Sequence, residues 1–225
     1  MNLKLAKAPT KEEMKRESPF LTHQIFITKA QVEEFENLLA ESAGKRKIDE
    51  FLVTNPEVFT SAIQNFRTGH HGAMIIPKQV IRPRIKTIDD KGLVPDFIIG
   101  GKNSDGWDWW VVELKGSNQN LFSQTNSDTY FSSEINKGIC QLLEYIDFCS
   151  ENQSNLRDTF KLEDFREPHG LLITGRESEV LENSKKQKLK AAWNRLNTGK
   201  LEIHTYDFMR RNLRALFELH NKQVV

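Results

Sequence analysis

Uninterrupted apolar residues mark two neighbouring segments in the middle of the chain. Residues 94–99 and 109–114 are rich in Val, Ile, Phe and Trp, and residues 100–106 between them are rich in glycine. Apolar strands that flank residues suited to tight turns and positive φ predict a β-hairpin. The ends of these strands that lie far from the turn carry charged side chains, which buried strands rarely contain. We therefore expect the chemistry of the chain to be centred on this hairpin.

Asp96, Glu113 and Lys115 are the charged residues at these strand ends. If the turn is centred on Ser104 and Asp105, Asp96 lies directly opposite Glu113. Because side chains alternate between the two faces of a strand, Lys115 shares the face of both acids. Two carboxylates about 4 Å apart repel by about 4 kcal/mol at an effective dielectric constant of about 20, which favours uptake of a proton or a cation.

This arrangement has the chemistry of phosphodiester hydrolysis. Hard divalent cations prefer oxygen ligands, so Asp96 and Glu113 are the predicted ligands of Mg²⁺, with Mn²⁺ as the alternative ion. Lys115 would orient the attacking water or stabilise developing charge. In the competing interpretation these charges are simply solvated, and the pattern has arisen by chance. The apolar residues that precede the charges favour the first interpretation, because they place the charges at the open end of a buried sheet.

Apolar residues at helical spacing predict three helices before the hairpin. Thr28 is the expected N-cap of the first, the second contains Phe51 and ends before Asn55, and Pro56 opens the third. After the hairpin, the polar segment 116–133 is expected to be a loop that either orders over a substrate or stays flexible, and the substrate-facing interpretation is slightly favoured. Helices and strands alternate from there to the end, which predicts an α/β fold with a central mixed sheet flanked by helices. The predicted elements are helices over 134–150 and 184–196, strands over 171–176 and 201–206, and a final helix capped by Asp207. Helical spacing predicts that Leu143 and Leu196 lie on the buried sides of the first two helices and that Lys186 points largely outward.

Composition limits the cellular setting of the 225-residue chain, which is long enough for one domain with an ample core. Its formal net charge of +1 means that local basic patches would have to hold a polyanion such as DNA. Arg82, Arg84 and Lys86 form one basic row, which suits either phosphate contacts or a solvated face. No apolar run has the length of a membrane span, and residues 1–17 lack the apolar core of a signal peptide, so we expect a cytoplasmic protein without a membrane partner.

The only cysteines, Cys140 and Cys149, fall on one predicted helix. They would lie about 13 Å apart along its axis, too far for a disulfide, and we expect both in the core. The absence of Cys pairs and of His-x-x-x-His spacing gives a zinc site little support.

The charged hairpin resembles that of the PD-(D/E)xK nuclease superfamily, which has a restriction-endonuclease-like core. Pro95-Asp96 matches the first half of the motif and Glu113-Leu114-Lys115 the second. Gln141 and Tyr145, four residues apart on the predicted helix 134–150, resemble the Gln-x-x-x-Tyr motif of RecB-like branches, where the Gln lies near the active site. Many members carry a further acid on an earlier helix. The candidates for this acid are Glu41, Asp49 and Glu50, and no pattern chooses among them.

A narrower resemblance, over about residues 47–208, is to the nuclease domain of the Shedu anti-phage defence proteins. It implies metal-dependent cleavage of DNA in bacterial immunity, commonly by a homo-oligomer. It also implies that Asp96 and Glu113 bind the metal, that Lys115 serves the attacking water and that Gln141 supports the site. The motifs occur in the same order and are Phe51-Leu52, Asn55-Pro56, Pro95-Asp96-Phe97, Glu113-Leu114-Lys115, Gln141, Ile173-Thr174-Gly175-Arg176 and Thr205-Tyr206-Asp207.

Residues 1–28 would form an N-terminal tail or small appendage, and residues 29–225 the nuclease domain. Nothing in the sequence resembles a large N-terminal sensing domain, so a separate sensor or regulatory protein is a candidate partner. Arg176 matches the family's Gly-Arg strand end and is either half of a structural ion pair or a phosphate contact. Two other functions use the same fold, a non-catalytic nucleic-acid or protein-binding module and a nuclease for RNA or for DNA repair.

Overall fold

The computed structural model describes residues 21–22, 27–59, 61, 71–81, 92–197 and 200–222. Most of the predicted N-terminal tail, residues 1–20 and 23–26, lies outside these residues, as does the basic row formed by Arg82, Arg84 and Lys86. None of the helices in the described part of the chain combines the length and the apolar character that crossing a membrane requires.

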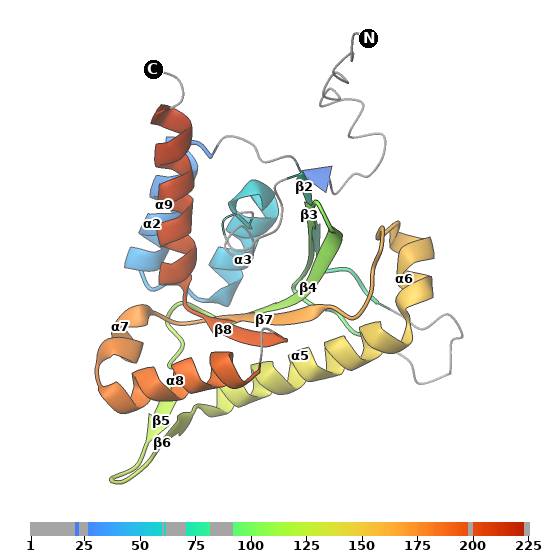
Figure 1. Cartoon of the computed structure of the whole chain (residues 1–225). Coiled ribbons are helices and arrows are strands. Elements are labelled where there is room, and N and C mark those ends of the chain that lie inside the picture. Colours follow the sequence, from blue (N-terminus) through green and yellow to red (C-terminus); the bar gives the residue numbers. More distant parts are fainter. Residues whose placement is uncertain are drawn as a thin grey trace.

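A six-stranded mixed sheet runs through the centre of the protein, in the order β1-β2-β3-β4-β7-β8 (Figure 1). Neighbouring strands from β1 to β4 pair antiparallel, and β7 and β8 continue the sheet in parallel with β4. This mixed sheet confirms the predicted fold class. The strands are β1 (Leu21–Thr22), β2 (Gly72–Pro77), β3 (Phe97–Asn103), β4 (Gly106–Leu114), β7 (His169–Ile173) and β8 (Leu201–His204).

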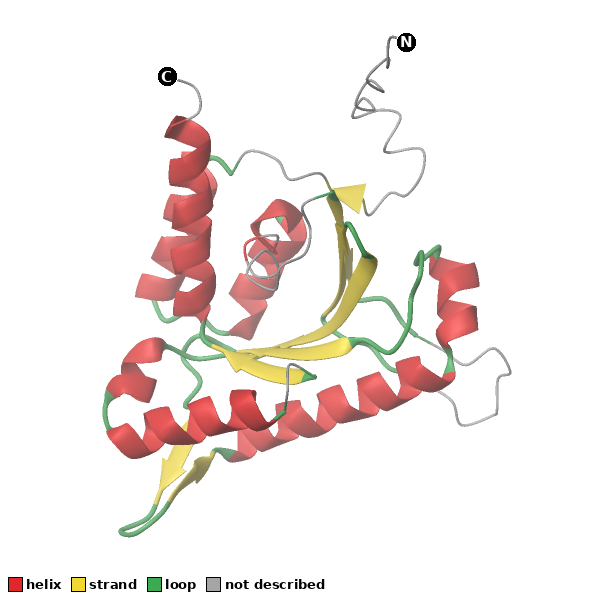
Figure 2. Cartoon of the chain, viewed as in Figure 1, coloured by secondary structure: helices red, strands yellow, loops and turns green. Residues whose placement is uncertain are grey.

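Helices cover both faces of this sheet (Figure 2). One face packs against α2 (Lys29–Ala40), α3 (Lys45–Thr54), the 3₁₀ helix η1 (Pro56–Phe59) and α9 (Tyr206–Lys222). The other face packs against α5 (Ser133–Glu151), α6 (Gln153–Phe160), α7 (Glu177–Leu181) and α8 (Ser184–Leu196). The start of the predicted third helix is a 3₁₀ helix over Pro56–Phe59, Ser61 is α-helical, and Ile63 lies outside the described residues. The helices α6 and α7 were not predicted.

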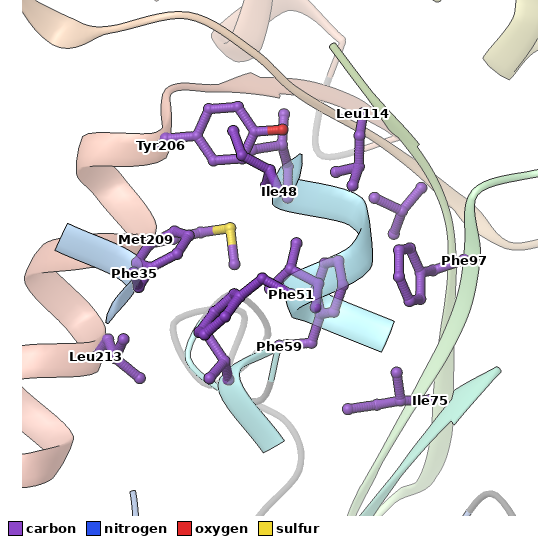
Figure 3. Packing of buried hydrophobic residues seen from close by; sticks show 14 of the residues in the cluster. Phe35, Ile48, Phe51, Phe59, Ile75, Phe97, Leu114, Tyr206, Met209 and Leu213 are labelled. Carbon is purple, nitrogen blue, oxygen red and sulfur yellow. The ribbon is translucent and has the colours of Figure 1, made fainter. Parts of the chain in front are cut away.

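Two hydrophobic cores lie on the two faces because successive strand residues point to opposite sides. Phe97 and Val112 contribute to the core beneath α2, α3 and α9, where Phe35, Phe51 and Met209 also pack (Figure 3). Ile98 and Val111 contribute to the core beneath α5 and α8. The same alternation decides to which face of the sheet Asp96, just before β3, and Glu113, near the end of β4, point.

The β3–β4 hairpin has a shorter turn than predicted. Pairing runs from Phe97↔Val112 to Asn103↔Gly106, so only Ser104 and Asp105 form the turn. Of the glycines expected in the loop, Gly100 and Gly101 belong to β3 and Gly106 belongs to β4. Gly100 is required because a Cβ would lie 2.6 Å from the Trp109 ring. A glycine opposite a large aromatic residue lets the indole lie across the neighbouring strand.

Residues 116–133 contain a second hairpin, which corrects the predicted loop. β5 (Phe122–Gln124) and β6 (Thr129–Phe131) pair antiparallel and project from the body of the protein (Figure 1). The rings of Phe122 and Phe131 stack 5.7 Å apart at its base. The Glu179 carboxylate accepts hydrogen bonds from the backbone N–H groups of Leu121 and Phe122. These contacts to α7 are long-range, and they fix a segment whose own composition indicates a loop.

Several predicted helix faces are also corrected. Lys186 was expected to point outward but is buried. Its ammonium lies over the Phe122 ring, 5.7 Å from the ring centroid, and pairs with Glu179 and Glu182. Leu143 and Leu196 were expected inside and are exposed. Cys149 is buried as predicted, but Cys140 is exposed.

The outer edge of β8 is covered by the side chain of Asn194 on α8. The Asn194 amide donates to the Ile203 carbonyl at 3.1 Å and accepts from the Ile203 N–H at 3.0 Å. Both outward-facing backbone groups of this edge residue therefore have partners within the chain.

Asp207 does not cap the final helix but joins it to the end of β7. Its carboxylate accepts hydrogen bonds from Arg176 Nε at 3.0 Å, from Arg176 Nη2 at 2.9 Å and from the Glu177 N–H at 2.7 Å. Arg176 Nη1 also donates to the Leu39 carbonyl at 2.5 Å, near the end of α2. Arg176 therefore makes the structural ion pair, the first of its two proposed roles.

The charge of Asp207 contributes to stability in a defined pH range. Burial alone would raise its pKa, but the hydrogen bonds from Arg176 and Glu177 outweigh burial and hold the pKa below the ordinary value. A carboxylate with a lowered pKa stabilises the fold above its unfolded pKa of about 4, and this contribution is lost as pH falls through the folded pKa.

We therefore expect Asp207→Asn to lower the free energy of unfolding by about 2 kcal/mol at pH 7, the magnitude of hydrogen bonds to a charged group. The difference from wild type should shrink below about pH 4. Urea unfolding at pH 7 and at pH 3 measures both values. Asp158→Asn, at an exposed position, is the control and should change stability little at either pH. An equal loss at both pH values for Asp207→Asn would contradict the role of its charge.

Candidate active site

The hairpin register places Asp96 opposite Glu113, as the sequence predicted. Phe97 pairs with Val112, so the next opposed positions are those of the two acids. Asp96 Oδ2 accepts a hydrogen bond of 2.8 Å from the Leu114 N–H, which holds the carboxylate against the end of β4. Asp96 and Glu113 are only 7% and 2% exposed, so both carboxylates need compensation for lost solvation.

Lys115 supplies part of that compensation. Its Nζ lies 3.1 Å from Glu113 Oε1 and 2.8 Å from Gln141 Oε1. The sheet thus provides the acid and the lysine, and α5 provides the glutamine that binds the lysine. Asp96 is linked to Glu113 by a second lysine, Lys45. The structure therefore brings together all four residues predicted for the site, Asp96, Glu113, Lys115 and Gln141.

That further lysine, Lys45, was not predicted. It is the first residue of α3, and its Nζ lies 2.6 Å from Asp96 Oδ2 and 3.1 Å from Glu113 Oε1. A single ammonium therefore bridges the two carboxylates. The sequence contains one signal for it, since three basic residues, 45–47, open a helix whose N-terminal dipole disfavours positive charge. Cations at this position need a negative partner.

The backbone brings α3 to the end of β4. Ser117, just after the hairpin, donates its N–H and its hydroxyl to the Ala43 carbonyl, at 3.0 and 2.8 Å. Gly116 permits this approach, because a Cβ there would lie 3.1 Å from Lys45 N and 3.3 Å from Gly44 Cα. Gly116 and Ser117, which follow Lys115, therefore fix the backbone position of Lys45.

Burial and charge act in opposite directions on the protonation of the site. Burial raises the pKa of Glu113 and the charge of Asp96 raises it further, while Lys45 and Lys115 lower it, and the net result is a raised pKa. Burial lowers the pKa of Lys45, but the hydrogen bond to Asp96 and the charge of Glu113 more than compensate and raise it. Lys45 is therefore held as an ammonium ion.

The main chain at Lys115 is held from two sides. Its N–H donates to the Ile173 carbonyl of β7 at 2.9 Å, and its carbonyl accepts from the buried Tyr206 hydroxyl at 2.7 Å. Tyr206 opens α9 directly beside the Asp207 ion pair. The Thr205-Tyr206-Asp207 motif thus supports the lysine of the hairpin.

Gly138 and Tyr145 adapt α5 to the site. A Cβ on Gly138 would lie 2.9 Å from Leu172 Cδ1 and 3.1 Å from Lys115 Cε, so only glycine leaves room for the lysine stem. The Tyr145 hydroxyl donates to the Val94 carbonyl at 3.2 Å, which ties the helix to the segment before Asp96. Both residues of the Gln-x-x-x-Tyr pattern therefore contact residues that flank the hairpin strands: Gln141 binds Lys115, and Tyr145 binds Val94.

Among the three candidates for an early helical acid, only Asp49 is buried. It lies one turn after Lys45 on α3, pairs with Lys78, and its Oδ1 has no hydrogen-bond partner, whereas Glu41 and Glu50 are exposed. Within the residues that the structure describes, no three His, Cys, Asp or Glu side chains are arranged to hold one metal ion. In the described residues the site therefore offers two neighbouring acids, Asp96 and Glu113, that could hold a metal ion.

This pair fits the requirements of Mg²⁺. The two carboxylates already share one cation, the Lys45 ammonium, so their oxygens converge on a position that suits positive charge. Mg²⁺ is usually bound by one or two carboxylates, with water or substrate phosphates completing its coordination. The donor set is therefore sufficient for a site completed by substrate.

Fold and site together define an α/β protein whose core is compatible with that of a nuclease. Residues 42–209 match the family described as Shedu protein SduA, C-terminal, and the chain belongs to this family. Membership implies a role in anti-phage defence. A search of curated proteins finds no match. The matched range contains every site residue described above, including Lys45.

We expect Gly138→Ala to displace Lys115 from its contacts and to lower the free energy of unfolding by about 1 kcal/mol. The overpacking cost of about 1–3 kcal/mol exceeds the gain of about 1 kcal/mol that Ala brings to a helix. Urea unfolding measures the change. The control is Lys137→Ala, at the exposed neighbouring position on α5, where the change should stay within about 0.5 kcal/mol. A Gly138→Ala protein more stable than wild type would contradict the steric role.

Proposed function

We propose that the protein is a metal-dependent endonuclease or nickase that hydrolyses phosphodiester bonds in DNA as an effector of anti-phage defence. One observation carries the proposal: two buried carboxylates share a cation at the end of a hairpin, beside a lysine bound to a glutamine. Membership in the Shedu family supports it. The order of the acids and the lysine also supports placement in the PD-(D/E)xK superfamily.

Asp96 and Glu113 would hold Mg²⁺ or Mn²⁺. When bound, the ion would supply Lewis acidity toward the phosphate and lower the pKa of a coordinated water. The low exposure of both acids means that they enter the reaction already desolvated, so their interaction with a cation is stronger than it would be in water. Asp49 is the early acid closest in character to the superfamily pattern, because it is buried and one of its oxygens lacks a partner.

Lys115 would stabilise the charge that develops at the scissile phosphate or orient the attacking water. Its ammonium is held by Glu113 and Gln141, and its carbonyl by Tyr206, so both ends of the residue have fixed positions. Preorganised donors of this kind stabilise a transition state without reorganisation during the reaction. Gln141 acts through Lys115 and is a positioning residue.

DNA would be held by local positive charge, because the chain as a whole carries a net charge of only +1. We propose a cytoplasmic homo-oligomer, with a separate sensor or regulatory protein as a further partner. These proposals follow from the family and from the site.

A non-catalytic nucleic-acid or protein-binding module is the second candidate function. It is favoured by the bridging Lys45, which satisfies both acids without a metal, and by the lack of a third acidic ligand beside them in the described residues. This module would bind DNA equally with and without divalent metal and would never cut it.

We expect the purified protein to cut plasmid or linear DNA only with Mg²⁺ or Mn²⁺, and Glu113→Gln to slow cleavage by at least about 100-fold. Agarose-gel assays with and without EDTA measure the rate. Glu144→Gln, at an exposed position on α5, is the matched control and should cut at the wild-type rate. Metal-independent cutting, or full activity in Glu113→Gln, would contradict the proposal. Parallel assays on RNA test the alternative substrate.

A further inference from the structure

Lys45 occupies the position in the site that a metal ion would need. Among the described residues, only the Lys45 Nζ forms ion pairs with both Asp96 and Glu113, at 2.6 and 3.1 Å. The acids are almost completely buried, whereas the Lys45 side chain is 39% exposed. The lysine therefore enters the acidic pair from the solvent side.

The position of Lys45 is unfavourable apart from these two contacts. It is the first residue of α3, where the helix dipole opposes a positive charge. No acidic residue in the first turn of α3 offsets this cost. The acids also need the lysine, since two buried carboxylates without a counter-ion repel each other and lose their hydration.

The geometry that brings Lys45 to the acids is built into the backbone. Gly116 allows the start of α3 to approach, and Ser117 binds the Ala43 carbonyl through both its N–H and its hydroxyl. The long, flexible stem of a lysine can withdraw without any change in this backbone. The contact is thus both favoured by the fold and reversible.

We propose that Lys45 is a built-in counter-ion that neutralises Asp96 and Glu113 in the metal-free protein and competes directly with a divalent cation for them. This inference rests on the proposed function, since it requires that the two acids bind metal. Metal binding displaces the ammonium toward solvent, at the open side of the site. The affinity of the site for metal is therefore lower than the two acids alone would provide, and the metal-free fold is more stable.

Calorimetric titration of Mn²⁺ into the Lys45→Met variant tests the competition. Methionine keeps an unbranched side chain of similar length and removes the positive charge. We expect the Kd for Mn²⁺ to fall by about tenfold, the effect of removing one competing ion-pair partner. Arg46→Met, the neighbouring residue on the exposed face, is the matched control and should bind Mn²⁺ with wild-type affinity. Asp96→Asn combined with Glu113→Gln should abolish binding and so identify the site.

Thermal unfolding with and without Mn²⁺ keeps the test decisive if Lys45→Met is less stable than wild type. We expect the metal-free Tm of Lys45→Met to lie below that of wild type, and the rise in Tm caused by saturating Mn²⁺ to be larger than in wild type. An equal or smaller rise, together with an equal or weaker Mn²⁺ affinity, would overturn the role of Lys45 alone. If neither wild type nor Lys45→Met binds Mn²⁺, both this inference and the metal part of the proposed function fail. Cleavage of DNA by wild type decides the proposed function separately.

Discussion

The structure depends on the neutralisation of two buried carboxylates at the end of a hairpin. Asp96 and Glu113 lie where β3 and β4 end, and the fold brings positive charge to them from two directions. Lys45 belongs to α3, in the helical layer on one face of the sheet, and Lys115 directly follows β4. Burial makes each contact stronger than it would be in water and makes the loss of either partner more costly.

The surrounding elements hold the backbone of the two lysines that contact the acids. Gly116 and Ser117 bring the start of α3 to the strand end, and Tyr206 binds the carbonyl of Lys115. The ion pair between Arg176 and Asp207 joins the end of β7 to α9, the helix that carries Tyr206. Segments more than a hundred residues apart in the sequence, around Ala43 and Tyr206, thus converge on the short stretch that follows β4.

The sequence was sufficient to predict the parts that depend on local periodicity. The opposition of Asp96 and Glu113 follows from strand alternation and a symmetric turn. Thr28 was predicted as the N-cap of α2, and the structure confirms this cap. Lys45 could not be placed in the same way, because its contact with the acids depends on how α3 packs against a distant strand. Lys186 was misplaced for a related reason: its burial depends on two glutamates and an aromatic ring that only tertiary structure brings to it.

The Asn194 amide has a consequence for how copies of the protein can assemble. Strands at the edge of a sheet commonly recruit a neighbouring chain through their free N–H and C=O groups. At Ile203 these groups already bind Asn194, so another molecule would first have to break two hydrogen bonds. A shared sheet that continues from one subunit into the next is therefore disfavoured across β8, and subunits that do associate would meet through helical or loop surfaces at this end of the molecule.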